Sequence, residues 1–325
     1  MKDIDRIRPK TIYERVIRQR ELDGIDFFEK YNTSFVKVKC SACGSEGDPM
    51  FNKWGYVHNS CGVCNTLFVS PRPDNYLLDK FYNEYEAPQL WTELLLSADE
   101  ERKKIQYMPR IEYIFSLLKN RNFKKALDVG AGSGAFTKCL EDTKRFETVI
   151  ALDISKECVD SCKKQGIEAY CTSIEDYQGD KFDIIFANDI VEHLFQPKEF
   201  IKSCLKNLNK EGVLCIATPN GQGFDYKILK ELTGNITPPE HLNYFNPYSI
   251  KILMEEAGFK HIIVETPGIL DADIIIKKRN EGYNLKEKNE YLDYLLSLDE
   301  KTVQSFQEFL KNNLLSSHMI AIAEK

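Results

Sequence analysis

The sequence lacks any hydrophobic run long enough to cross a membrane. No stretch approaches the roughly 18 uninterrupted apolar residues that predict a transmembrane helix. The N-terminal segment also lacks the apolar core of a signal peptide, and it carries Asp3 and Asp5 early, so neither a secretory nor a mitochondrial leader is predicted. We therefore expect a cytoplasmic protein without a membrane span.

The sequence also lacks a surplus of positive charge. It contains 44 lysines and arginines against 50 aspartates and glutamates, for a net charge of −6 at pH 7. Proteins that bind nucleic acids usually carry a basic stripe or patch. The charge balance therefore gives no reason to expect a nucleic acid as a partner.

Cysteine is plentiful, but its distribution excludes a secreted disulfide framework. Ten cysteines are present, and four of them form two tight pairs. The other six are spread through segments that read as alternating helices and strands, where small buried thiols are ordinary. These six are Cys139, Cys158, Cys162, Cys171, Cys204 and Cys215. A reducing compartment fits this pattern.

The two cysteine pairs predict a zinc ribbon. Cys40 and Cys43 form one C-x2-C pair, and Cys61 and Cys64 form a second pair after a 17-residue spacer. Each pair has a glycine nearby, which lets two thiolates converge from one tight turn. Four thiolates supply the tetrahedral environment that zinc prefers and leave no open position. We therefore expect a structural zinc ion rather than a catalytic one.

The remaining sequence divides into segments of different character. The helical segment after the ribbon is rich in aromatics, and we expect Tyr82, Tyr85 and Trp91 to pack in a core rather than to form a lid. The predicted segments are an N-terminal helical arm (1–36), the zinc ribbon (37–73), a helical linker or lid (74–119) and an α/β domain (120–325) with a helical insertion at about 269–315.

The α/β domain begins with a glycine-rich turn. In "KKALDVGAGSGAFTKCLED" a short apolar strand enters a turn containing Gly130, Gly132 and Gly134, and the chain leaves as a helix. Missing side chains let this backbone approach a ligand, and the helix start offers free N–H groups. Asp153 ends the next strand, where a doubly wound sheet places a carboxylate against ribose hydroxyls. Alternating strands and helices follow, which predicts a mostly parallel sheet.

These residues resemble the class I S-adenosylmethionine-dependent methyltransferases. The resemblance rests on "LDVGAGSG", "ALDIS", "SIED" and "NDIVEHLFQP" and covers roughly residues 105–325. It implies a Rossmann-like sheet of seven strands, with the last strand antiparallel, and S-adenosylmethionine as the cofactor. The implied cofactor-binding residues are Asp128, Gly130, Ala131, Gly132, Gly134, Asp153 and Ile154, with Ser173, Ile174 and Glu175 near the adenine and Asn188 and Asp189 near the methionine portion.

Two histidines fall in loops at the ligand-binding edge of the predicted sheet. A hydroxyl acceptor must lose a proton during methyl transfer, and histidine has the right pKa for a base. We favour His241, in "PPEHLNYF", as the base, with Glu240 orienting or binding the substrate. His193, in "VEHLFQP", is the second candidate, although it could instead shape the cofactor pocket together with Glu192.

A zinc module ahead of such a domain, with "EHLNYF" after the fifth strand, is similar to sugar C-methyltransferases and to enzymes from bacterial surface-polysaccharide clusters. In the former, the histidine of a Glu-His pair removes a proton next to a keto group. This chain has Pro238 where those enzymes have a tyrosine, and it has no room for their extra C-terminal domain. We therefore expect O-methylation of a sugar hydroxyl, on a small molecule or a glycan, ahead of C-methylation of a keto sugar.

Three other functions stay open at the level of the sequence. A zinc module before a methyltransferase domain also resembles certain ribosomal RNA methyltransferases, in which the ribbon would read RNA, although the acidic composition counts against this. A quinone precursor is an alternative acceptor. A protein that senses S-adenosylmethionine without turnover is the third alternative. Homo-oligomerisation is also left open.

Overall fold

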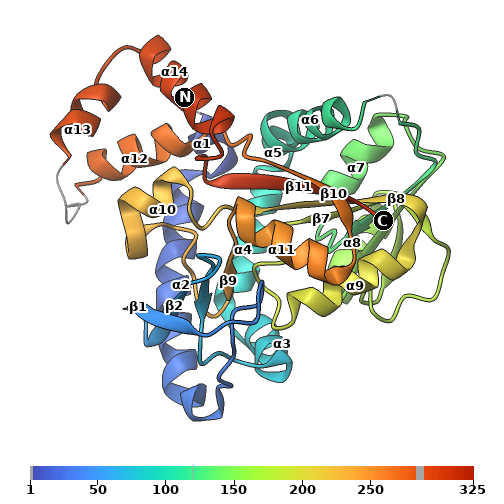
Figure 1. The fold of residues 1–325 in the computed structure, drawn as a ribbon, viewed down its shortest axis with the longest axis horizontal. Coiled ribbons are helices and arrows are strands. Elements are labelled where there is room, and N and C mark those ends of the chain that lie inside the picture. Colours follow the sequence, from blue (N-terminus) through green and yellow to red (C-terminus); the bar gives the residue numbers. More distant parts are fainter. Residues whose placement is uncertain (1–2, 120, 283–288) are drawn as a thin grey trace.

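The computed structural model describes residues 3–119, 121–282 and 289–325 and contains a twisted seven-stranded sheet between two layers of helices (Figure 1). The strand order is β10-β11-β8-β7-β4-β5-β6. Strands β4 to β8 run parallel, whereas β11 is antiparallel to both of its neighbours. The bounds are β4 Lys125–Val129, β5 Thr148–Asp153, β6 Glu168–Cys171, β7 Phe182–Asn188, β8 Leu208–Pro219, β10 Lys260–Glu265 and β11 His318–Glu324. The predicted sheet and its antiparallel last strand are confirmed.

Apolar residues alternate along each central strand, so the sheet buries both of its faces. In β7, Ile185 and Ala187 belong to the core cluster that includes α9 and α11, whereas Ile184 and Phe186 belong to the cluster on the opposite face with α6 and α7. A sheet covered by helices on both sides is the doubly wound arrangement. The flanking helices are α6 Met108–Leu117, α7 Ala135–Asp142, α8 Lys156–Lys164, α9 Pro197–Asn207 and α11 Pro247–Ala257.

A second, smaller sheet contains the cysteine module and one strand from far along the chain. Its order is β1-β2-β3-β9, and all of its pairs are antiparallel. The bounds are β1 Gly47–Lys53, β2 Tyr56–Cys61, β3 Leu67–Val69 and β9 Asn243–Tyr244. Because β9 is part of "EHLNYF", the module predicted for residues 37–73 is joined through a β-ladder to the loop that contains His241.

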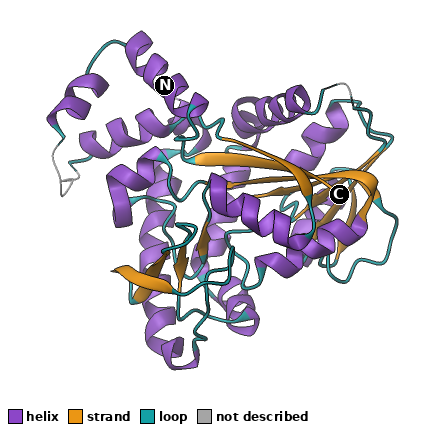
Figure 2. Cartoon of the chain, in the orientation of Figure 1, coloured by secondary structure: helices purple, strands orange, loops and turns teal. Residues whose placement is uncertain are grey.

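The long helix α2 runs beside the small sheet, as the ribbon drawings show (Figures 1 and 2). Helix α2 contacts α4, and Phe27 of α2 is fully buried against the ring of Phe81 in α3. The bounds are α1 Asp3–Ile7, α2 Lys10–Tyr31, α3 Asn75–Glu84, α4 Glu86–Ser97 and α5 Asp99–Arg102, followed by a wide turn over Lys103–Tyr107.

The segment predicted as a helical insertion packs on helix α10 Phe224–Leu229. Leu229 forms an apolar cluster with Ala272, Ile275, Leu292 and Leu296 from the insertion. Residues 283–288 of the predicted insertion lie outside the described residues. The insertion helices are α12 Asp271–Asn280, α13 Glu290–Leu296 and α14 Glu300–Asn312. Packing against the domain is therefore the observed role of its apolar residues.

Candidate active site

The predicted cofactor residues gather at the carboxyl ends of four neighbouring parallel strands. In a doubly wound sheet this edge binds ligands. The Ile154 side chain is exposed at this edge and could contact a ligand, whereas the Ile174 side chain is buried in the core. The residues at each strand end are Asp128 and Gly130–Gly134 for β4, Asp153 and Ile154 for β5, Ser173–Glu175 for β6, and Asn188 and Asp189 for β7.

The backbone of the glycine loop has a conformation that residues other than glycine rarely adopt. Gly130, Gly132 and Gly134 have φ of 65°, 54° and 89°, in the left-handed region that favours glycine. A Cβ on Gly134 would lie 2.9 Å from the sulfur of Cys162, whereas a Cβ on Gly132 would meet no atom within 4 Å. The Gly132 N–H donates to Oδ2 of Asp153 at 2.9 Å, which fixes the loop against the end of β5.

Asp128 lies beneath the glycine loop rather than at its surface. Its carboxyl is 1% exposed and accepts a hydrogen bond from Thr137 Oγ1 at 2.6 Å. Burial raises the pKa of Asp128 to about 7. The observed contact links β4 to the start of α7, and direct contact of Asp128 with a cofactor stays a prediction.

The end of β7 carries a polar cluster that the sequence predicted only in part. Arg110 of α6 donates to Asn188 Oδ1 at 2.9 Å and lies 3.6 Å from an Asp189 oxygen, and His318 lies 3.2 Å from Asp189. Burial alone would raise the pKa of Asp189, but Arg110 and His318 outweigh it and hold that pKa well below its usual value. Neither Arg110 nor His318 belongs to a sequence motif, so the sequence did not predict that they would lie beside Asp189.

Both predicted base candidates lie in one site. The rings of His193 and His241 are 4.6 Å apart between centroids and nearly perpendicular. Nδ1 of His193 lies 2.9 Å from the main-chain oxygen of Glu240, and Nδ1 of His241 lies 2.7 Å from that of Asn235. Because a carbonyl only accepts, both Nδ1 atoms carry the proton, and both Nε2 atoms keep a free lone pair.

The local environment keeps both imidazoles neutral. Burial lowers the pKa of His193 to about 4 and lowers the pKa of His241 well below its usual value, with the neighbouring His193 adding to the effect. Glu192 is 2% exposed, and burial followed by the nearby Asp189 raises its pKa to about 8. Thr218 Oγ1 donates to Oε2 of Glu192 at 2.9 Å. Glu192, His193 and His241 thus form one buried to partly buried polar cluster.

Glu240 forms a buried ion pair with the N-terminal helical arm. Both of its carboxylate oxygens accept from Arg20 of α2, at 2.9 and 2.6 Å, and both side chains are about 5–6% exposed. The Arg20 guanidinium also lies 4.3 Å from the ring centroid of Trp91. A substrate-binding role for Glu240 stays a prediction; the observed contacts attach its loop to α2.

The expectation that the three linker aromatics pack in a core is wrong for Tyr82. Tyr82 is 38% exposed and its hydroxyl lies 2.9 Å from Nδ1 of His193, so it borders the histidine pair. Trp91 packs as expected against a buried cluster that includes Leu90 and Leu94, and its ring also lies against Arg20. Tyr85 packs as expected too, stacked on Phe81. Sequence spacing could not separate these cases because helix periodicity identifies a buried face but not what covers it.

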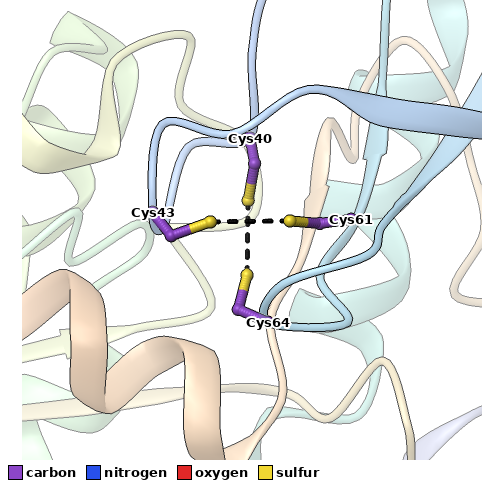
Figure 3. A group of neighbouring side chains, drawn as sticks. All are labelled: Cys40, Cys43, Cys61 and Cys64. Atoms are coloured by element: carbon purple, nitrogen blue, oxygen red, sulfur yellow. Dashed lines mark hydrogen bonds between the residues drawn. The ribbon is translucent and has the colours of Figure 1, made fainter.

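The four predicted metal-ligating cysteines converge on one point (Figure 3). The sulfurs of Cys40 and Cys64 are 3.5 Å apart, as are those of Cys43 and Cys61. Tetrahedral zinc–sulfur bonds of about 2.3 Å place sulfurs about 3.8 Å apart, so the four thiols fit such an ion. Each pair sits on a matching turn, in which the residue after the pair has a positive φ and donates back to the first cysteine's carbonyl.

The chain matches the family model described as a methyltransferase domain over residues 99–264, which is just over half of its length. The chain therefore belongs to this methyltransferase family, and it is an S-adenosylmethionine-dependent enzyme. The predicted enzyme class is confirmed. None of the helices in the described ranges is both long and apolar enough to span a membrane.

Two kinds of curated relatives are similar to parts of the chain. An uncharacterized protein of Methanocaldococcus jannaschii is 24% identical over 210 residues, which cover 64% of this chain and 93% of that protein. The mitochondrial ubiquinone biosynthesis O-methyltransferase of Saccharomyces cerevisiae is 31% identical over 119 residues, and its counterpart from Actinobacillus pleuropneumoniae over 124. Each match covers 34% of this chain and only 38% and 52% of those enzymes.

Solved structures share the fold at low sequence identity. A Haemonchus contortus phosphoethanolamine N-methyltransferase in complex with S-adenosylhomocysteine has a TM-score of 0.51 and 14% identity, covering 80% of this chain and 62% of that one. The plantazolicin methyltransferase BamL, also with S-adenosylhomocysteine, has a TM-score of 0.50 and 16% identity, covering 76% and 94%. At such identities the likeness shows the fold alone.

Proposed function

We propose that the chain transfers a methyl group from S-adenosylmethionine to a hydroxyl oxygen of a small molecule or glycan, with a sugar hydroxyl as the first candidate. The observation that carries this proposal is the pair of neutral imidazoles, His193 and His241, each with a free Nε2 near the strand ends that bear the cofactor residues. A hydroxyl acceptor must lose a proton, and neutral imidazoles promote this either by accepting the proton or by holding a metal ion that acidifies the hydroxyl.

The residues at the strand ends fit S-adenosylmethionine, which when bound supplies the methyl group as an electrophile. Asn188 Nδ2 is buried and has no hydrogen-bond partner among the described residues, so it is free to donate to a ligand. Arg110 and Asp189 offer opposite charges suited to the carboxylate and ammonium of an amino acid. The Asp153 carboxylate, at the end of β5, offers acceptors for ribose hydroxyls.

Replacing Asp153 with asparagine tests this cofactor placement. Asparagine keeps the size of the side chain and one oxygen that accepts from the Gly132 N–H, but it loses the acceptor for the Ser155 N–H and the negative charge offered to the ribose. Hydrogen bonds to charged groups contribute about 1.5–3 kcal/mol, so the affinity should fall at least about tenfold. Isothermal titration calorimetry with S-adenosylhomocysteine measures this. Asp160→Asn, on the exposed face of α8, is the control and should bind normally; equal affinities of both variants would contradict the assignment.

We propose a structural zinc ion at the four cysteines. Four thiolates complete a tetrahedron and leave no position for a substrate. Support comes from the sulfur spacing of 3.5 Å and from the two matching turns. The ion would hold the small sheet, and through β9 it would support the loop of His241.

A second candidate acceptor is the phenolic hydroxyl of a quinone precursor. The likeness to two ubiquinone biosynthesis O-methyltransferases favours it, although it covers about a third of this chain. The same cluster of Glu192, His193 and His241 would serve either hydroxyl. The two candidates differ in the group that carries the reacting oxygen, which is a sugar ring in the first and an aromatic ring in the second.

Incubating the full chain with methyl-labelled S-adenosylmethionine and fractionated cell extract separates the acceptors. Label in nucleotide sugars or glycans, stable as a methyl ether, supports the first candidate. Label in the lipid-soluble quinone fraction supports the second candidate and overturns the first. Label in RNA overturns both and would make the cysteine module a recognition element for RNA.

His241→Ala is expected to lower turnover by about 10²–10⁴-fold, which is the usual contribution of a positioned proton-accepting group. Affinity for S-adenosylhomocysteine should stay near that of the unmodified enzyme, because the proposal places His241 against the acceptor and not against the cofactor. His261→Asn removes an exposed imidazole at the start of β10 and serves as the matched control. Turnover of His241→Ala close to that of this control would remove His241 from the mechanism.

A further inference from the structure

A second group of potential metal ligands lies apart from the four cysteines. Glu192, His193 and His241 each offer one ligand atom, and these three atoms all lie within 4.8 Å of one another. Two histidines and one carboxylate form a ligand set that proteins use for catalytic divalent metals. Unlike the four cysteines, three ligands leave coordination positions open.

Hydrogen bonds hold the side chains of Glu192, His193 and His241 in the way that is usual for metal ligands. A metal-ligating histidine almost always donates its other ring N–H to a carbonyl or carboxylate. Here the Nδ1 atoms of both imidazoles are bound by main-chain oxygens, at 2.9 Å for His193 and 2.7 Å for His241. Among the described residues this leaves the Nε2 atoms as the ring nitrogens able to bind an ion. Glu192 is likewise held, because Thr218 donates to its Oε2 at 2.9 Å.

Glu192 differs from the neighbouring acidic groups in lacking a cationic partner. Glu240 is buried but is paired with Arg20, and Asp189 is close to Arg110. Glu192 is equally buried, at 2% exposure, yet within the described ranges it forms no ion pair and its side-chain partner is a neutral hydroxyl. A carboxyl group in such a place stays protonated unless a cation compensates its charge. A divalent cation bound by Glu192 and the two imidazoles would displace that proton, because metal ligands bind in their deprotonated form.

We propose that Glu192, His193 and His241 bind a divalent transition-metal cation whose open positions take two adjacent oxygens of the acceptor. This inference rests on the proposed O-methylation and specifies its acceptor as a vicinal diol or a catechol. With the cation held there, the nitrogens of His241 and His193 serve as ligands in place of a base. The cation lowers the pKa of the bound hydroxyl. The acceptor hydroxyl then loses its proton to water, its oxygen forms the bond to the methyl carbon, and the carbon–sulfur bond breaks with its electron pair staying on sulfur.

Manganese binding tests the site because Mn²⁺ prefers nitrogen and oxygen ligands and competes poorly for four thiolates. The zinc-loaded full chain is titrated with Mn²⁺, and free Mn²⁺ is followed by electron paramagnetic resonance. One Mn²⁺ per chain is expected. Glu192→Gln, which keeps an acceptor for Thr218, and His241→Ala should each weaken binding about 100-fold or more, since changes even in outer-shell partners cost 10–100-fold. His261→Asn should bind normally.

Turnover after chelation completes the test. Loss of methyl transfer in EDTA, with the cysteine-bound zinc retained, and its return with Mn²⁺ would support the site. Absent Mn²⁺ binding together with EDTA-insensitive O-methylation would overturn the cation site while leaving the proposed function intact. Mn²⁺ bound through Glu192 and His241, with no hydroxyl acceptor methylated, would support the site and overturn the proposed function.

Discussion

Replacing Cys61 with serine is expected to lower methyl transfer by at least about 100-fold, although Cys61 lies outside the large methyltransferase sheet. Cys61 ends β2, and its loss leaves three thiolates for the proposed zinc ion. Structural zinc in small modules contributes about 10–16 kcal/mol of apparent binding free energy, so a module of this size depends on it for folding. The small sheet should therefore lose its order in the variant.

The disorder would reach the loop of His241 through β9. Strand β3 pairs with β9 through Leu67 and Tyr244 and through Phe68 and Asn243, and the Asn246 side chain donates to the Cys64 carbonyl at 2.9 Å. His241 precedes β9 by two residues. A displacement of about 1 Å in a catalytic group can cost about 10²-fold in rate, so turnover should fall by at least that factor.

Three measurements on Cys61→Ser check this prediction. Zinc content should fall from one ion per chain to none, turnover should fall at least about 100-fold, and S-adenosylhomocysteine should still bind, because the glycine loop belongs to the large sheet. Cys158→Ser, on α8 and outside the module, is the control and should keep its zinc and its turnover. A zinc-free Cys61→Ser enzyme with normal turnover would show that the module does not support the site.

The large sheet is predictable from the sequence because its signals are local. Strands β4, β5 and β7 are short apolar runs that end beside a glycine or an acid, such as Gly130 or Asp153, and each is followed by a helical pattern. The carboxyl ends of parallel strands share one edge, so residues that follow them must converge. The convergence of the residues that follow β4 to β7, and the position of His193 among them, follow from this rule.

The surroundings of Glu240 and His241 are less predictable because long-range contacts build them. The pairing of Arg20 with Glu240 joins residues 220 positions apart, and neither residue has a neighbour in sequence that indicates the other. The same is true of β9, whose two residues read as part of a loop until β3 supplies a pairing edge. Tyr82 and Arg110 likewise come from helices whose periodicity indicates only a buried face.

The Arg20–Glu240 ion pair is a long-range contact that we expect to contribute strongly to the free energy of unfolding. Arg20→Ala is expected to destabilise the protein by about 3–5 kcal/mol, because it leaves a buried carboxylate without its partner. Chemical denaturation measures the loss. Arg18→Ala, an exposed arginine on the same helix, should change stability by no more than about 0.5 kcal/mol. Adding Glu240→Gln to Arg20→Ala should recover part of the loss, since an amide carries no charge to bury.

The pH dependence of Arg20→Ala separates lost charge pairing from lost packing on Trp91. Burial raises the pKa of Glu240, and Arg20 opposes that rise. Without Arg20, the folded-state pKa lies further above the unfolded value of about 4.3, so the folded state binds the proton more tightly. The variant should therefore regain stability, relative to the unmodified protein, as the pH falls from neutral toward about 4.3. A loss that stays constant over this range would instead assign the effect to packing of the guanidinium on Trp91.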